Sequence, residues 1–406
     1  MTHLPKPEIP ELTWLRFAAA FCVLVAHTVH WLCYQYDPIP SIISCIMRLA
    51  GIGMPLFFVL SGFVIHYNYN TFFKNTLFKN YPKFIKLRFA RLYPLYILCI
   101  IVCLICFRFG LRPNSAYAEN SFLSSNILYF ITMTQSFIFI TYNNLYHFSQ
   151  ILLGISWSVS TEFFFYFCYP FLAYFIFNKI TRNIHIIICI CYFILIYIIM
   201  YSIFLHQNIL VSIGETIFSV TPENRNIFNY WFIYLSPYIR IFEFIAGCLA
   251  AQFVLTFKQN KKNSIKIYNS IIVLVVFISI LFLTYYDGFQ FLVFMRMNFL
   301  LAFPFFLVLC SIGAYRQIYP YPGQDNTLLG KLGAISYSIY LLSAFTISFV
   351  MIYFPAAPQK YIIVWFIFKC IIALFLTIGL SFLTYKYIEL PGKKFIRSFH
   401  IQCKGE

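Results

Sequence analysis

Long apolar segments recur along the whole of this 406-residue chain, and each ends in polar, charged or proline residues. A helix needs roughly 20 apolar residues to cross the hydrocarbon core of a bilayer. The segments that meet this length lie at about 12–33, 42–67, 90–109, 152–178, 184–205, 232–257, 267–286, 292–313, 332–354 and 362–388. The pattern therefore predicts an all-α, polytopic transmembrane helix bundle of about ten spans.

A further apolar segment, at about 122–141, is interrupted by serine, threonine, asparagine and glutamine side chains. Interruptions of this density favour a helix that lies in the membrane interface, or re-enters the membrane without crossing it. We therefore predict an interfacial or re-entrant helix at this segment, with an eleventh span as the alternative.

The distribution of Lys and Arg favours ten spans with both termini in the cytoplasm, because positive residues concentrate in cytoplasmic loops. With this orientation the inner segments, together with Lys6, Arg16 and Lys386 at the inner end of the last span, hold 21 of the 29 Lys and Arg residues. These inner segments are 68–91, 178–183, 257–266, 314–331 and the C-terminal tail. One more crossing would invert every later loop and lose this asymmetry.

Composition agrees with a membrane location, since 61% of the residues are hydrophobic and 10% are charged, against about 25% charged in soluble domains. A net charge of +17 would suggest nucleic acid in a soluble protein, but cytoplasmic loops explain it here. The 13 cysteines lie mostly in apolar runs and lack CxxC pairs with nearby His ligands. We therefore expect no nucleic-acid partner and no metal.

No long polar stretch separates the apolar segments, apart from the external segments 110–150 and 206–231. The expected organisation is one transmembrane domain, residues 1–395, followed by a short basic cytoplasmic tail, residues 396–406. No fused extracytoplasmic domain and no removable signal peptide are expected. Any chemistry must then take place inside the bundle.

Ionisable residues within a membrane are costly, and they are functional or paired by default. The first span has two, Arg16 and His27, in the string LRFAAAFCVLVAHT. A separation of 11 residues places both on one helix face, about 16 Å apart. Arg16 is then at the cytoplasmic mouth and His27 in the outer half, where a neutral imidazole can act as a general base. The alternative for His27 is a packing hydrogen bond to a helix carbonyl.

The second span contains the string GIGMPLFFVLSGFVI, in which Ser61 and Gly62 are small. Small residues let a ligand or another helix approach the backbone closely. The string therefore indicates either a substrate-lining position or close helix packing.

The cytoplasmic segment before the third span ends in KFIKLRFARLYPLY, which sets Arg88 and Arg91 three residues apart, with Lys83 and Lys86 one turn earlier. Arginine recognises phosphates through paired hydrogen bonds, so this cluster can clamp a phosphorylated substrate. Ordinary cytoplasmic positive charge is the alternative.

The fourth span opens with SWSVSTEFFFYFCYP, in which Trp157, Ser158 and Ser160 precede Glu162. A carboxylate inside the membrane needs a partner, for which His27 and a membrane arginine are the candidates. A carboxylate that contacts His27 would fix its tautomer. Helix-to-helix hydrogen bonding is the alternative.

Two later strings also carry polar groups. Arg240 and Glu243 in PYIRIFEFIAGCLA are three apart and suit an intrahelical ion pair. Tyr337 lies in ISYSIYLLSAF, and Glu389 lies among basic residues at the end of the last span. Each can line a cavity or pack against a neighbour.

Taken in order, these strings resemble the acyltransferase 3 family of multi-pass membrane O-acyltransferases over about residues 11–395. The resemblance rests on Arg16 with His27, FFVLSGF (57–63), RxxRLYPLY (88–96), SWSxSxE (156–162), RxxEFxxG (240–247), SYSIYL (336–341) and the terminal pair Glu389 and Pro391. Many relatives have a histidine where this chain has Ser343, and some have a second acidic residue where it has Phe163.

The resemblance implies transfer of an acyl group, expected to be acetyl, from cytoplasmic acyl-CoA to a hydroxyl of an extracytoplasmic or lipid-linked glycan. It implies that Arg16, Arg88 and Arg91 bind the donor and that His27 and Glu162 are catalytic. The residues expected to line the substrate are Ser61, Gly62, Trp157, Ser158, Ser160, Arg240, Glu243 and Tyr337. A bacterial cytoplasmic membrane is the expected location.

A transporter or flippase for a lipid-linked sugar is the alternative function, because intramembrane His, Arg and Glu also mark proton-coupled transport. A transporter needs no phosphate-binding arginines and favours paired half-chain repeats, which are not evident. A receptor or scaffold is less favoured, since the external loops are short. The sequence leaves open which glycan accepts the acyl group.

Overall fold

The computed structural model describes residues 8–33, 41–74, 76–109, 120–256, 265–285, 287–288, 290–296, 299–323, 325–354 and 362–398. Helices make up most of this part of the chain. The long helices are α1 (Pro10–Cys33), α3 (Ala50–Tyr69), α4 (Leu77–Arg108), α6 (Trp157–Phe171), α7 (Arg182–Leu205), α10 (Pro237–Thr256), α11 (Ile265–Tyr285), α13 (Ala302–Ile318), α15 (Ser336–Tyr353) and α16 (Ile362–Thr384).

Shorter elements connect or cap the long helices. The short α-helices are α2 (Ser41–Met47), α5 (Asn120–Ile131), α8 (Gln207–Phe218), α9 (Arg225–Tyr230), α12 (Gln290–Arg296), α14 (Leu328–Ala334) and α17 (Leu390–Ser398). Strands β1 (Thr141–Tyr142) and β2 (Tyr146–His147) form one antiparallel hairpin. Three π-helical turns cover Leu172–Ile176, Trp231–Leu235 and Tyr385–Glu389. Three 3-10 turns cover Phe148–Gln150, Phe177–Lys179 and Phe299–Leu301.

Nine helical stretches in the described residues are long and apolar enough to cross a membrane. Each coincides with one of the predicted spans, so the prediction of a multi-pass helical membrane bundle is confirmed. The remaining predicted span, 267–286, corresponds to α11, which has 21 residues and a shorter apolar stretch, Ile272–Phe282. The count of ten and the cytoplasmic placement of both termini stay predictions.

The predicted interfacial or re-entrant helix at 122–141 is partly present as α5, whose 12 residues end at Ile131. A helix of this length is too short to cross a bilayer. The chain continues as turns in which Gln135 and Ser136 are fully buried. Gln135 donates to Tyr96 Oη at 3.1 Å, and Ser136 donates to Ser160 Oγ at 2.8 Å. These bonds satisfy polar groups of a non-helical segment inside the bundle.

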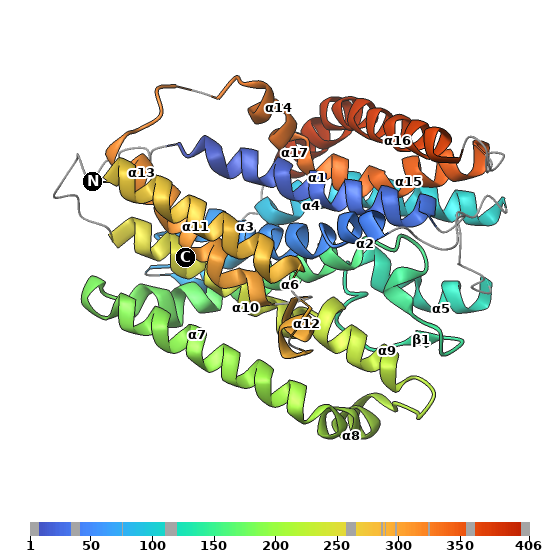
Figure 1. Ribbon diagram of the computed structural model, residues 1–406, viewed down its shortest axis with the longest axis horizontal. Coiled ribbons are helices and arrows are strands. Elements are labelled where there is room, and N and C mark those ends of the chain that lie inside the picture. The colour runs from blue at the N-terminus through green and yellow to red at the C-terminus, as the bar shows by residue number, and fades with distance from the viewer. Residues whose placement is uncertain are drawn as a thin grey trace.

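Helix α3 occupies the centre of the bundle, between α1 and α10 (Figure 1). A Cβ atom on Gly62 would lie 1.9 Å from the carbonyl oxygen of Phe244, and one on Gly247 would lie 1.9 Å from that of Val59. The backbones of α3 and α10 therefore touch at these two glycines. Small residues at such crossings are the usual means of helix association in membranes.

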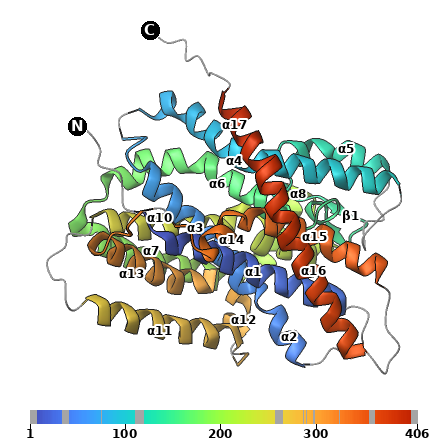
Figure 2. The same ribbon diagram turned by 90° about the horizontal axis from the view of Figure 1, so that it is seen from above.

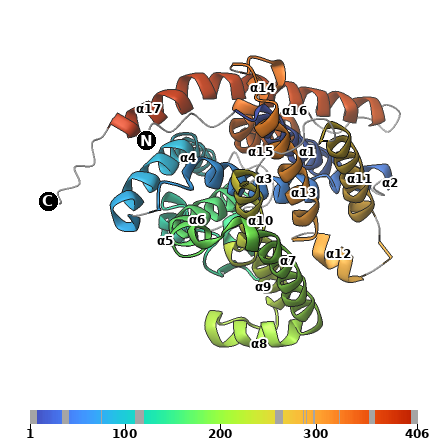
Figure 3. The same cartoon turned by 90° about the vertical axis from the view of Figure 1, so that its left-hand side faces the viewer.

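The two ends of the bundle differ in which elements they hold. Helices α1 and α4 begin, and α16 continues into α17, at one end, which we call the basic end (Figures 1 and 2). Strand β1 and helices α5 and α8 lie toward the other end. The view along the long axis places α16 and α17 on one side of the bundle and α8 on the other (Figure 3).

The last predicted span, 362–388, continues further than its apolar pattern indicates. The π-helical turn Tyr385–Glu389 joins α16 to α17 without a loop, so the helix ends at Ser398. The predicted boundary between domain and tail at residue 395 falls inside α17. The rest of the predicted tail lies outside the described residues.

Candidate active site

One cavity brings together side chains from α1, α3, α4, α6 and α15. It is lined by Arg16, Met54, Phe57, Phe58, Ser61, Arg91, Ser158, Val159, Glu162, Ser336, Tyr337 and Tyr340. Two guanidinium groups and one carboxylate therefore face a space with hydroxyl and aromatic walls. Charged groups in a cavity inside a membrane bundle indicate a binding or catalytic site.

The two arginines that line the cavity have no ion pair. Within the described part of the chain, neither Arg16 nor Arg91 makes a hydrogen bond or an ion pair within 4.0 Å. Each acts electrostatically on the other and on Glu162. A cation in this setting normally has a partner. The arrangement therefore leaves positive charge available to an anion that enters the cavity.

Glu162 is fixed by two hydroxyl groups. Its Oε1 accepts a hydrogen bond from Ser61 Oγ at 2.9 Å and another from Tyr166 Oη at 2.5 Å. Tyr166 is one turn further along the same helix, and Ser61 comes from α3. The carboxylate is thereby oriented at the side of the cavity that α3 and α6 form.

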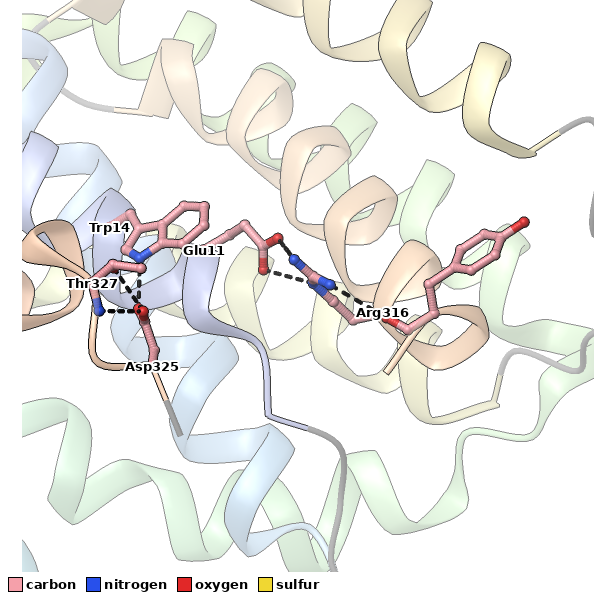
Figure 4. A network of polar contacts seen from close by, with 6 residues as sticks. Glu11, Trp14, Arg316, Asp325 and Thr327 are labelled. Atoms are coloured by element: carbon pink, nitrogen blue, oxygen red, sulfur yellow. Dashed lines mark hydrogen bonds and ion pairs between the residues drawn. The ribbon is translucent and has the colours of Figure 1, made fainter. Parts of the chain in front are cut away.

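The beginning of α1, which carries Arg16, is anchored to α13 (Figure 4). Arg316 Nε donates to both carboxylate oxygens of Glu11, at 2.9 and 3.0 Å, and Arg316 Nη2 also donates to Glu11. Bidentate pairing of this kind fixes orientation as well as distance. The anchor lies five residues before Arg16 and limits the rotation of α1 about its axis.

A second anchor ties α1 to the segment that leads into α14 (Figure 4). Trp14 Nε1 donates to Asp325 Oδ2 at 2.7 Å, and Thr327 Oγ1 donates to Asp325 Oδ1 at 2.6 Å. These donors favour the charged carboxylate, and they lower the pKa of Asp325, with Thr327 as the largest cause. Arg16 is thus carried by a helix end that is held at two points.

Arg88 lies in a different environment from Arg91, although the two residues are one turn apart on α4. Its guanidinium lies over the ring of Tyr69, 4.6 Å from the centroid, and Nη2 donates to Tyr69 Oη at 2.5 Å. The side chain is 8% exposed, and Nε has no partner among the described atoms. Arg88 therefore does not line the cavity, but it acts electrostatically on Arg16. Its role in donor binding stays a prediction.

His27 lies 11 residues beyond Arg16 on α1 and is not among the cavity-lining residues. No hydrogen bond joins His27 to any residue that the structure describes. His27 and a membrane arginine were the two expected partners of Glu162. In the structure Arg16 and Arg91 line the same cavity as Glu162, whereas His27 does not. A straight helix explains the separation, because 11 residues span about 16 Å.

Three of the eight residues expected to line the substrate, namely Ser61, Ser158 and Tyr337, line the cavity. Gly62, Trp157 and Ser160 lie outside its lining. Gly62 faces α10, Trp157 packs edge-on against Phe58 with ring centroids 6.2 Å apart, and Ser160 accepts a hydrogen bond from Ser136. Their contact with substrate stays a prediction.

Arg240 and Glu243 form the predicted intrahelical ion pair and also lie outside the lining. Arg240 Nη1 donates to Glu243 Oε1 at 2.9 Å, and the two side chains are 0% and 1% exposed. Arg240 Nε donates to the carbonyl oxygen of Tyr234 at 2.8 Å. The guanidinium also lies over the Tyr234 ring, 4.5 Å from its centroid. The pair is enclosed by protein.

Sequence reasoning missed Tyr340 and Ser336 as cavity residues. Tyr340 accepts from Ser158 Oγ and donates to the carbonyl oxygen of Ile155, both at 2.7 Å. Its position three residues after Tyr337 and four after Ser336 places all three on one face of α15. That spacing within SYSIYL was the available signal.

Comparison with protein families gives a match over nearly the whole chain. The family model described as an acyltransferase domain matches residues 9–386, which include the whole lining of the cavity. Comparisons with curated proteins and with solved structures give no match. A match over nearly the whole chain shows membership, so this multi-pass membrane protein belongs to the acyltransferase 3 family.

Proposed function

We propose that the protein is a membrane O-acyltransferase that moves an acyl group, expected to be acetyl, from acyl-CoA to a hydroxyl of a glycan. The donor is cytoplasmic, and the acceptor is an extracytoplasmic or lipid-linked sugar of the cell envelope, such as that of a lipopolysaccharide or another surface polysaccharide. The observation that carries the proposal is the pair of unpaired arginines, Arg16 and Arg91, around Glu162 in one cavity.

Acyl-CoA fits this charge pattern. Coenzyme A carries a diphosphate and a 3′-phosphate, and guanidinium groups bind phosphates through charge-assisted, paired hydrogen bonds. Arg16 and Arg91 would hold part of this charge, with Arg88 one turn closer to the basic end. The excess of Lys and Arg at the basic end supports a cytoplasmic position for that end, where acyl-CoA is found. A bacterial cytoplasmic membrane suits this orientation.

In the proposed reaction His27, which lies outside the lining of the cavity, is the general base. The thioester would extend from the phosphate site along α1 toward His27, and the acceptor would enter from the opposite end. The acyl carbon then forms a bond to the sugar oxygen as its bond to the CoA sulfur breaks. The hydroxyl proton moves to His27 and from there to the departing thiolate. A transient acyl group on His27 is the alternative route.

Glu162 has an electrostatic role in this proposal. Its carboxylate, oriented by Ser61 and Tyr166, lines the same cavity as the two arginines. Its negative charge would offset the repulsion between the guanidinium groups and help to orient them. The family match favours this function over a transporter or flippase for a lipid-linked sugar.

The test is a comparison of donor binding and turnover in detergent-purified protein with radiolabelled acetyl-CoA. Wild type is expected to bind acetyl-CoA and release CoA. The variant His27→Ala is expected to bind without releasing CoA, and Arg91→Gln is expected to bind at least tenfold more weakly. Folded wild-type protein that neither binds nor turns over acyl-CoA would overturn the proposal.

A further inference from the structure

The C-terminal helix α17 packs against α4, the helix that carries Arg88 and Arg91 (Figures 2 and 3). The two helices meet at Gly392 and Pro94, where a Cβ atom on Gly392 would lie 2.5 Å from Cβ of Pro94. Only glycine allows this approach without a shift of one helix. Because Pro94 is one turn beyond Arg91, the contact brings α17 to the level of that arginine.

Two polar contacts fix α17 in this position. At its beginning, Ser338 Oγ of α15 donates to Glu389 Oε1, the last residue of the π-helical turn. Near its end, Lys86 Nζ of α4 donates to the carbonyl oxygen of Arg397 at 3.3 Å. The helix is therefore attached to both α15 and α4, which both contribute residues to the cavity.

Lys393 follows Gly392 on α17, and its side chain is partly buried. Its electrostatic interactions are with Arg397 of the same helix first, then with Arg91 and Arg88 of α4 and with Glu389. Lys394, the next residue, is exposed. Two carboxylates, Glu389 and Glu162, act on Arg91, so positive charge remains in excess among these four cations. Their mutual repulsion is unfavourable unless an anion joins the group.

We propose that Lys393 is a phosphate-binding residue of the donor site, and that it acts with Arg88 and Arg91 on the phosphates of coenzyme A. The inference rests on the proposed function, since it assigns a further group to the same donor. Lysine binds phosphate as a compact point charge, whereas arginine does so through its planar fork. The phosphates of CoA carry more negative charge than two arginines neutralise, so a third cation can also bind them.

The position of Lys393 favours the donor over a lipid headgroup. A residue that binds headgroups projects from the protein surface, as Lys394 and Arg397 do, because both are exposed. Lys393 is instead partly buried, one residue from the Gly392–Pro94 contact between α17 and α4. Phosphate would reach it from the side of Arg88 and Arg91.

The test measures the Kd of CoA in a neutral detergent for wild type, Lys393→Gln and the neighbouring control Lys394→Gln. Both substitutions remove one positive charge from the same turn. We expect Lys393→Gln to raise the Kd about tenfold, as for loss of one charge-assisted hydrogen bond, and Lys394→Gln to change it less than twofold. The variant Lys393→Arg, which keeps the charge, is expected to restore most of the affinity.

The outcomes separate this inference from the proposed function. Wild type that binds CoA, together with Lys393→Gln that binds it equally well, overturns the role of Lys393 alone. Wild type that does not bind CoA overturns both. An equal loss of CoA affinity in Lys393→Gln and Lys394→Gln shows a nonspecific effect of charge and also overturns the proposed role of Lys393. A loss of CoA affinity in Lys393→Gln that appears only after anionic lipid is added identifies a lipid-headgroup site instead, and this result overturns the proposed role as well.

Discussion

Two groups of arginine and glutamate lie inside this apolar bundle, and they differ in how their charges are balanced. Arg240 and Glu243 are joined at 2.9 Å, are at most 1% exposed and lie outside the cavity lining. Arg16 and Arg91 surround Glu162 without an ion pair in the described part of the chain, and all three line the cavity.

The difference shows which intramembrane charges indicate function. A pair whose members neutralise each other within one helix turn needs nothing from outside the protein, and its removal affects folding. Arginines that face a cavity without a partner remain available to a ligand, and their removal affects binding. Each of the following substitutions tests one side of this comparison.

The largest effect is expected on stability, for Arg240→Met. The substitution leaves the Glu243 carboxylate buried without its partner, which costs about 3–5 kcal/mol in other proteins. The measurement is the unfolding midpoint in detergent. The double variant Arg240→Met/Glu243→Leu removes both charges and is expected to recover most of the loss. A single variant as stable as wild type would show that the pair is not structural.

A smaller effect, on activity, is expected for Arg91→Gln. Loss of one guanidinium that contacts the donor should lower kcat/KM for acetyl-CoA about 100-fold, or about 2.7 kcal/mol. The unfolding midpoint should stay close to that of wild type, since no ion pair is broken. The control Arg48→Gln removes the same charge from an exposed pair with Asp287. Equal losses in the two variants would contradict the assignment.

The next effect in size is expected for Glu162→Gln, which keeps the shape of the side chain and removes its charge. We expect kcat to fall about tenfold to 30-fold, because the arginines lose the group that orients them. CoA binding should not weaken, since a negative charge has been removed from beside the phosphates. A loss of CoA binding with unchanged kcat would place Glu162 in a different role.

The smallest effect is expected for Ser61→Ala, which removes one of the two hydroxyl donors to Glu162. A single hydrogen bond contributes about 1 kcal/mol, so activity should fall about fivefold and less than in Glu162→Gln. Combining Ser61→Ala with Glu162→Gln should add little, because both act through the same carboxylate. Full additivity of the two losses would show that Ser61 acts on the substrate independently.

The membrane spans could be predicted from sequence because the bilayer requires long apolar segments, and nine of the predicted spans meet that requirement in the structure. The end of α5 at Ile131 and the continuation of α16 through a π-helical turn were not predicted. Hydropathy contains no signal for a buried irregular segment such as the one around Gln135, since the amide nitrogen of Gln135 donates to distant residues such as Tyr96.

The site was predictable in its residues and less so in its geometry. Arg16 and Glu162 were identified as costly intramembrane charges and Arg91 as part of a cytoplasmic basic cluster, and the structure brings all three to one cavity. Their convergence depends on the rotation of α1, α4 and α6, which is set by contacts with distant residues, such as the bond from Arg316 to Glu11 of α1, and not by local sequence. For the same reason the approach of Lys393 to Arg91 could not be read from a motif near the end of the chain.

The central claim is that the unpaired arginines of the cavity take the phosphates of the donor. The most direct measurement is the Kd of CoA for four purified forms: wild type, Arg16→Gln, Arg91→Gln and Arg240→Met/Glu243→Leu. We expect at least a tenfold higher Kd in each of the first two variants, and the wild-type value in the third. CoA affinity that is equal in all four forms would contradict the claim.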